Sequence, residues 1–103
     1  MITEQLISTI EHCHSLNICH RDIKSDNVLI DKNTLKIKLL DFGLGLKLST
    51  RKSLRVTRCG TLRYMAPEII AGTKSSPFGL DAWALGVLVT FMATGCFPFE
   101  GNF

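Results

Sequence analysis

The chain has 103 residues, which is within the usual range for one domain. Hydrophobic residues make up 46% of it and charged residues 20%, so the chain can bury a core. The net charge of +3 is too small to argue for nucleic-acid binding by itself, and we expect no nucleic-acid partner.

The four cysteines stand at positions 13, 19, 59 and 96 and form no Cys-x-x-Cys pair. The first residues lack the basic-then-apolar pattern of a secretory signal. We therefore expect free thiols in a reducing compartment, which favours an intracellular, cytoplasmic location.

A cluster of potential metal ligands lies near the N-terminus, comprising His12, Cys13, His14, Cys19 and His20. Neighbouring side chains on a helix point in different directions, so the first three cannot converge on one ion. The spacings also miss the usual zinc patterns, and we disfavour a metal site here.

Residues 3–16 are expected to form a helix. Their apolar side chains recur at three- and four-residue spacing, at Leu6, Ile7, Ile10 and Cys13. Asn17 is a plausible stop. Residues 20–27 are too polar and irregular for either period and are expected to form a loop.

A β-hairpin is predicted next. Residues 28–30 are apolar, residues 31–34 are turn formers, and residues 35–39 alternate as a half-buried strand does. The hairpin would bring Asn27, just before the first strand, close to Asp41, just after the second.

Residues 44–63, which we call the basic segment, show no sustained period. With no acidic residue between Asp41 and Glu68, the region carries six basic ones: Lys47, Arg51, Lys52, Arg55, Arg58 and Arg63. We expect a mobile surface segment, which is either a solvated loop or a loop that awaits a phosphate or an acidic substrate.

Two further helices are predicted. Residues 67–71 form a short one, with proline near its start and Gly72 as its stop. After a loop over residues 74–79, Asp81 opens an apolar helix that runs to about Ala93. Residues 82–99 carry no charge, which could suit a membrane span, but a helix that is apolar all round is more often a buried core helix, and we expect no membrane partner.

Three motifs follow one another along the chain. Residues 20–27, which we call the HRD loop, read HRDIKSDN. Asp41-Phe42-Gly43 follows the second predicted strand, and Ala66-Pro67-Glu68 follows the basic segment. Each motif alone is common, whereas their joint occurrence in this order, with Lys24 and Asn27 at matching offsets, is highly specific.

Taken together, they resemble the catalytic loop, the metal-binding triplet and the end of the activation segment of a eukaryotic protein kinase of the serine/threonine type. The resemblance implies an α+β fold that is mainly α, like the C-lobe of a kinase, with a small hairpin beside the catalytic loop. It implies ATP and Mg²⁺ as cofactors and a protein as the substrate.

The resemblance also assigns catalytic roles. Asp22 would orient the attacking hydroxyl and take its proton, and Lys24 would lie beside the transferred phosphoryl group. Asn27 and Asp41 would hold Mg²⁺ through oxygen ligands. Thr61 matches the threonine that contacts the catalytic aspartate.

Other positions carry regulatory or structural roles by the same resemblance. Arg21 would pair with a phosphorylated segment, in which Thr57 is the expected phosphorylation site. A plain exposed threonine is the alternative for Thr57, and Ser49, Thr50 and Ser53 are alternative sites.

The remaining assignments are structural. The resemblance gives His20 a structural place in the loop, while Phe42 would hold Asp41 in place and Gly43 would let the backbone turn. Glu68 would pair with an arginine near the C-terminus of the domain. Asp81 would hold the backbone of the HRD loop.

The sequence contains no Gly-x-Gly-x-x-Gly loop and no Val-Ala-Ile-Lys-like strand before residue 20. We therefore expect residues 1–103 to be a partial kinase domain without the N-lobe and the C-terminal helices, inactive alone. The alternative is a non-catalytic kinase remnant that acts as a binding module. The sequence leaves the oligomeric state open.

Overall fold

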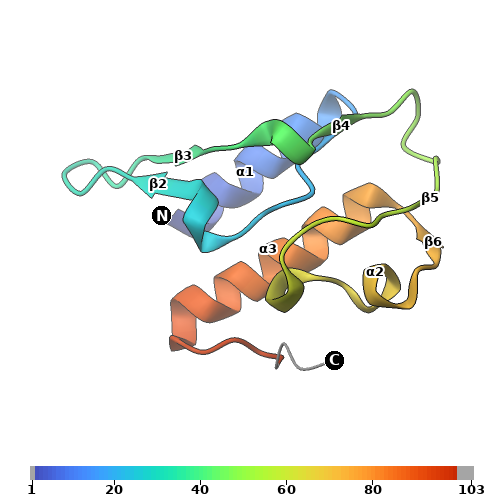
Figure 1. The fold of residues 1–103 in the computed structure, drawn as a ribbon. Helices are drawn as coiled ribbons and strands as arrows, with labels where there is room; N and C mark the ends of the chain where they lie inside the picture. Colours follow the sequence, from blue (N-terminus) through green and yellow to red (C-terminus); the bar gives the residue numbers. More distant parts are fainter. Residues whose placement is uncertain (1, 100–103) are drawn as a thin grey trace.

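A computed structural model describes residues 2–99 and shows an α+β fold that is mainly α, as predicted (Figure 1). The helices are α1 (Ile2–Ser15), α2 (Pro67–Ala71) and α3 (Pro77–Thr94). The strands are β1 (Ile18–Cys19), β2 (Val28–Ile30), β3 (Ile37–Leu39), β4 (Leu46–Lys47), β5 (Arg55–Val56) and β6 (Lys74–Ser75). Single 3₁₀ turns cover Ser25–Asn27, Phe42–Leu44 and Leu62–Tyr64.

Helix α1 confirms the first predicted helix, and the chain leaves it through Asn17, which has a left-handed φ of 60°. Its buried side chains are Leu6, Ile10 and His14, at steps of four residues. Ile7 is 41% exposed, so the predicted stripe was wrong at that position. The buried face is narrower than the apolar pattern and ends on a histidine, because His14 meets a polar partner inside the fold.

The predicted hairpin is confirmed, with β2 antiparallel to β3 and Val28 opposite Leu39. The second strand begins at Ile37 rather than at residue 35, because Leu35 adopts a left-handed φ of 58° and belongs to the turn. The Gln5 side chain ties the hairpin to α1. Its amide nitrogen donates to the Leu35 carbonyl at 2.8 Å, and its amide oxygen accepts from the Ile37 N–H at 3.0 Å.

Helix α3 begins at Pro77, four residues before the predicted start at Asp81. Proline occupies the first turn, where its missing N–H costs no helical hydrogen bond. Asp81 therefore lies in the second turn, and its carboxylate bonds to the HRD loop instead of capping its own helix. The helix ends at Gly95, whose φ of 76° is left-handed.

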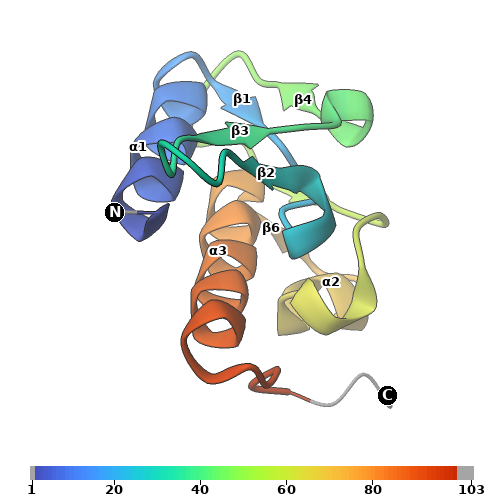
Figure 2. The same ribbon diagram turned by 90° about the vertical axis from the view of Figure 1, so that its left-hand side faces the viewer.

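Helix α3 contributes more side chains to the main buried cluster than any other described element. Figures 1 and 2 show α1 and the hairpin on one side of it and α2 on the other. The main cluster of buried side chains comprises Leu6, Ile10, Ile23, Tyr64, Ala84, Val87 and Leu88. Among residues 2–99, α3 is the one helix whose length and apolar composition would suit a membrane span. In this fold 39% of that stretch is buried, through contacts with the main cluster.

The basic segment is more ordered than its sequence predicts. Strand β4 pairs with β1, and β5 pairs with β6, which lies just before α3. Leu48 is buried, and its N–H donates to the Asn17 carbonyl at 2.8 Å. The expectation of a surface segment was therefore wrong at Leu48 and Thr57, which are buried. Two-residue strands near the start and in the middle of the segment hold it without producing a visible period.

Candidate active site

The backbone of the HRD loop is held by one carboxylate. Asp81, which is 2% exposed, accepts the N–H of His20 at 2.8 Å and the N–H of Arg21 at 2.9 Å. Its Oδ2 also accepts the Nε2–H of His14 at 2.9 Å. A buried backbone N–H without an acceptor is costly, so the conformation of the loop depends on this side chain.

His20 fixes the next step of the loop with both ring nitrogens. Its Nδ1 accepts the N–H of Asp22 at 3.1 Å, which leaves Nε2–H to donate to the Leu40 carbonyl at 2.7 Å. The Phe42 ring packs edge-on against the imidazole, with centroids 4.6 Å apart. His20 therefore connects the HRD loop to the segment that contains the Asp41 triplet. The contact that the structure shows for the Phe42 ring is with this histidine.

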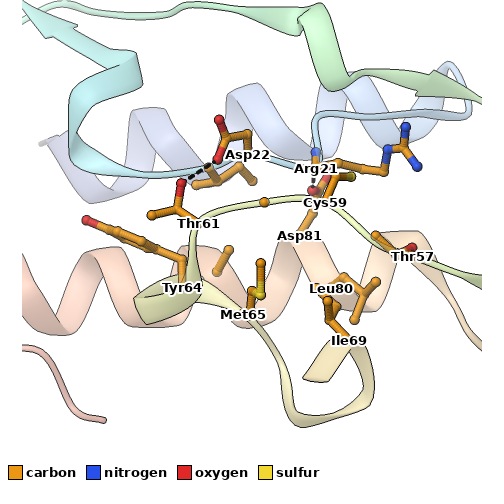
Figure 3. A pocket seen from close by; sticks show the side chains of 13 residues that line it. Arg21, Asp22, Thr57, Cys59, Thr61, Tyr64, Met65, Ile69, Leu80 and Asp81 are labelled. Atoms are coloured by element: carbon orange, nitrogen blue, oxygen red, sulfur yellow. Dashed lines mark hydrogen bonds between the residues drawn. The ribbon is translucent and has the colours of Figure 1, made fainter. Parts of the chain in front are cut away.

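Three polar side chains surround the Asp22 carboxylate, and Figure 3 shows the Thr61 hydroxyl directed at it. Thr61 donates to Oδ1 at 3.0 Å, and Lys24 Nζ lies 3.7 Å from Oδ2. The Asn27 amide nitrogen lies 3.5 Å from Oδ2 and donates a shorter bond of 2.8 Å to the backbone carbonyl of Asp22. The structure thus brings together the four residues to which the resemblance gives catalytic roles.

Asn27 and Asp41 approach each other across the base of the hairpin. The Leu40 N–H donates to the Asn27 carbonyl at 2.7 Å, and Asp41 is the next residue after Leu40. This bond holds the backbones of the two candidate metal ligands close together. Asp41 has a left-handed φ of 57°, and its Oδ1 accepts the Gly43 N–H at 3.1 Å. A Cβ at Gly43 would lie 3.0 Å from that oxygen, so a larger residue there would require the Asp41 carboxylate to shift.

The donor set here suits a hard cation. The Asn27 amide oxygen makes no hydrogen bond within the described part of the chain. The Oδ2 of Asp41 likewise accepts no hydrogen bond from residues 2–99. Magnesium prefers such carboxylate and amide oxygens and keeps several waters or phosphate oxygens besides. The residues present therefore fit the predicted cofactor.

Thr57 departs from the sequence expectation. It is 2% exposed, so the plain exposed threonine considered above is excluded in this conformation. Its hydroxyl is buried with no hydrogen-bond partner among residues 2–99. Other atoms of Thr57 help to line a cavity of about 20 Å³, which Asp22 and Thr61 also line. That space admits roughly one water and no substrate side chain. A regulatory role for Thr57 stays a prediction, and it requires the segment to open.

Two predicted charge partners are not seen in this conformation. The Arg21 Nε donates to the Leu44 carbonyl at 2.7 Å, so the guanidinium lies against the basic segment. It forms no ion pair with a carboxylate among residues 2–99. The Glu68 carboxylate makes no ion pair within residues 2–99. Both assignments stay predictions.

The sequence interpretation missed two supporting residues. His14 was considered as a metal ligand, yet it bonds to Asp81, and its place four residues after Ile10 on the buried face could have indicated this. The Tyr64 hydroxyl accepts the Ser25 N–H at 3.2 Å and so fixes the middle of the HRD loop. No sequence period signals that contact, because the two residues lie on separate irregular segments.

The disfavoured metal cluster takes a different form in the structure. His14, Cys19 and Asp81 place one potential ligand atom each within 4.8 Å of one another. The Asp81 oxygens already accept three N–H groups, and burial, followed by the charge of Asp81, raises the pKa of the Cys19 thiol to about 12. A thiolate ligand is therefore disfavoured, and the cluster is a hydrogen-bonding centre.

Comparison with known proteins agrees with this geometry. Residues 1–102 match the family model for the protein kinase domain. The chain belongs to the protein kinase family. The fold, the HRD loop and the Asp81 contact are thus features of a kinase chain.

Several serine/threonine kinases are similar to this kinase chain. Sperm motility kinase 3A of Mus musculus is 41% identical over 97 residues, which cover 94% of this chain and 19% of the relative. The probable serine/threonine-protein kinase HSL1 of Saccharomyces cerevisiae is 38% identical over 99 residues, 96% of this chain and 6% of its own length. Serine/threonine-protein kinase SIK2 of Gallus gallus is 42% identical over 97 residues, 94% of this chain and 12% of its own. The chain thus spans about a fifth or less of the length of these relatives.

Replacing Asp81 with alanine should lower the free energy of unfolding by about 3–5 kcal/mol, because it strands the buried N–H groups of His20 and Arg21. Urea titration followed by circular dichroism measures the change. Glu11→Ala, which removes an exposed carboxylate from α1, is the control. Equal midpoints for the two variants would show that Asp81 does not hold the loop.

Replacing Thr57 with valine should raise the free energy of unfolding by about 1 kcal/mol, because it removes a buried hydroxyl that has no partner and keeps the shape. Thr61→Val is the matched variant and should lower stability, since it deletes the bond to Asp22. The same titration compares both, and a loss of stability in Thr57→Val would contradict the burial described here.

Cys19 should react with thiol reagents far more slowly than Cys96 at pH 8. Cys19 is buried with a pKa of about 12, so its reactive thiolate is scarce, whereas Cys96 is exposed. Peptide mass spectrometry after timed alkylation of the native chain measures both rates, and alkylation in urea should make them similar. Comparable native rates would be evidence against a closed environment around Cys19.

Proposed function

We propose that this chain supplies the phosphoryl-transfer residues of a serine/threonine protein kinase, which moves the γ-phosphoryl group of ATP to Ser or Thr hydroxyls of a protein substrate. The proposal depends above all on the Asp22 carboxylate, which accepts the alcohol hydroxyl of Thr61 at 3.0 Å. A general base must reach its proton donor at about this distance.

The residues around Asp22 support specific roles. Asp22 would orient the substrate hydroxyl and accept its proton as the new O–P bond forms. Lys24, 3.7 Å from Asp22, would compensate negative charge beside the transferred group. Thr61 fixes the rotation of the Asp22 carboxylate through its hydrogen bond. Little covalent chemistry is asked of the protein, and positioning supplies most of the effect.

Asn27 and Asp41 would hold Mg²⁺, whose charge neutralises the phosphate oxygens of ATP when it is bound. Their position is set by the hairpin, because the Leu40 N–H bonds to the Asn27 carbonyl. The Gly43 N–H restrains the Asp41 carboxylate. Hydrogen bonds within the protein thus restrain the Asn27 backbone and the Asp41 carboxylate before any metal binds.

The glycine-rich loop and strand lysine of a complete kinase have no counterpart in the 103 residues. A test of activity therefore needs a chimera in which a related kinase provides them. Residues 1–102 would replace the matching segment of sperm motility kinase 3A of Mus musculus, which is 41% identical. We expect this chimera to phosphorylate a Ser- or Thr-containing peptide.

In that chimera, Asp22→Asn should lower kcat by about 10²–10⁴-fold, because the amide cannot accept the proton, while KM for ATP changes little. Asp31→Asn, the same change in the exposed hairpin turn, should leave both constants unaltered. A chimera that folds and binds ATP but transfers no phosphate would contradict the proposal and favour the non-catalytic binding module.

A further inference from the structure

One arginine of the basic segment reaches behind the HRD loop. The Arg51 Nη1 donates to the His14 carbonyl at 3.2 Å, and its guanidinium carbon lies 4.2 Å from the centroid of the Phe78 ring. The carbonyl belongs to the last turn of α1, where the helix dipole favours a cation. The guanidinium thus has two independent attractive contacts.

Phe78 and His14 connect this contact to the Asp81 centre. Their rings meet edge-on with centroids 4.9 Å apart, and Phe78 is 5% exposed. His14 then bonds to Asp81 Oδ2, the same oxygen that accepts the His20 N–H. Arg51 therefore lies at the outer end of a chain of contacts that runs through Phe78, His14 and Asp81 to the backbone of the HRD loop.

The surroundings of Arg51 make it the main tie of this stretch. Ser49, Thr50, Lys52 and Leu54 are exposed. The backbone N–H groups within residues 49–54 make only local hydrogen bonds, such as that of Lys52 to the Thr50 side-chain hydroxyl at 3.3 Å. The hydrogen bonds and ring contacts that reach from residues 49–54 to the rest of the described chain all come from Arg51.

We propose that Arg51 is a positioning residue that steadies the HRD loop through Phe78, His14 and Asp81. The importance of this for phosphoryl transfer rests on the proposed function above, whereas the coupling itself does not. The planar guanidinium can stack on the ring and bond to the carbonyl together, which a lysine ammonium cannot reproduce.

The first test measures amide hydrogen exchange on the native 103-residue chain by NMR. Arg51→Ala should speed exchange at the His20 and Arg21 amides by about two- to fivefold, as expected for loss of an exposed cation–π contact. The hairpin amides of Leu29 and Lys38 should be unchanged. Lys52→Ala is the matched control, since it removes an adjacent exposed charge that has no such contact.

Two further variants separate coupling from charge. Arg51→Lys should behave much like Arg51→Ala, because it keeps the charge and loses the stacking. Phe78→Leu should speed the same amides, and Arg51→Ala should then have a smaller effect than in the unmodified chain, because only the bond to the His14 carbonyl remains to be lost. Unchanged exchange at His20 and Arg21 in Arg51→Ala would overturn the proposal, as would full additivity of the two changes.

The chimera distinguishes the two proposals. If it is active, Arg51→Ala should lower kcat about two- to fivefold with KM for ATP unaltered, because nucleotide contacts are untouched. Faster exchange with an unchanged kcat would overturn the positioning role. If the unmodified chimera is inactive, the proposed function fails alone, and the exchange data still decide whether Arg51 is coupled to the loop.

Discussion

The Asp81 carboxylate is the interaction on which the rest of the site depends. It accepts two backbone N–H groups of the HRD loop and the imidazole N–H of His14, so it joins α3 to the loop and to the end of α1, both of which lie 60 to 67 residues earlier in the sequence. A buried charge of this kind is tolerable only when it is fully hydrogen-bonded. The three donors satisfy that condition, and the loop gains a fixed backbone in return.

Two of the four left-handed residues other than glycine in the described part of the chain lie at the candidate site. Arg21 and Asp41 both have left-handed φ values, 69° and 57°, although neither is glycine. Such residues cost of order 1–3 kcal/mol each and persist only when neighbouring contacts impose them. Asp81 restrains the Arg21 N–H, and the Gly43 N–H restrains the Asp41 carboxylate. The two strained residues adjoin Asp22 and the candidate metal ligands, where accurate positions matter most.

Much of this arrangement follows from the sequence, and the reasons differ between elements. Apolar periodicity was sufficient for α1 and for β3, since each directs alternate or repeated positions toward the core. The turn formers at residues 31–34 indicated that β2 pairs with β3. The motifs led to Asp22, Asn27, Asp41 and Thr61 through resemblance, and the geometry brings these residues together.

Elsewhere local patterns were insufficient. The start of α3 was misplaced because an aspartate before an apolar run looks like a helix cap, whereas Asp81 bonds to a distant loop. Strands β4 and β5 are two residues long and show no period. The burial of Thr57 arises from tertiary packing, to which a polar local sequence gives no clue.

Helix α3 is continuous in its backbone but uneven in its packing. Its fully buried residues end at Leu88, while Met92 is 39% exposed and the Thr94 hydroxyl turns back onto the Thr90 carbonyl. Fraying of the last turn would therefore leave Asp81 and its three donors in place. The exposed positions from Met92 to Thr94 can therefore tolerate substitution or new attachments, whereas the buried positions of the first three turns cannot change without disturbing the loop.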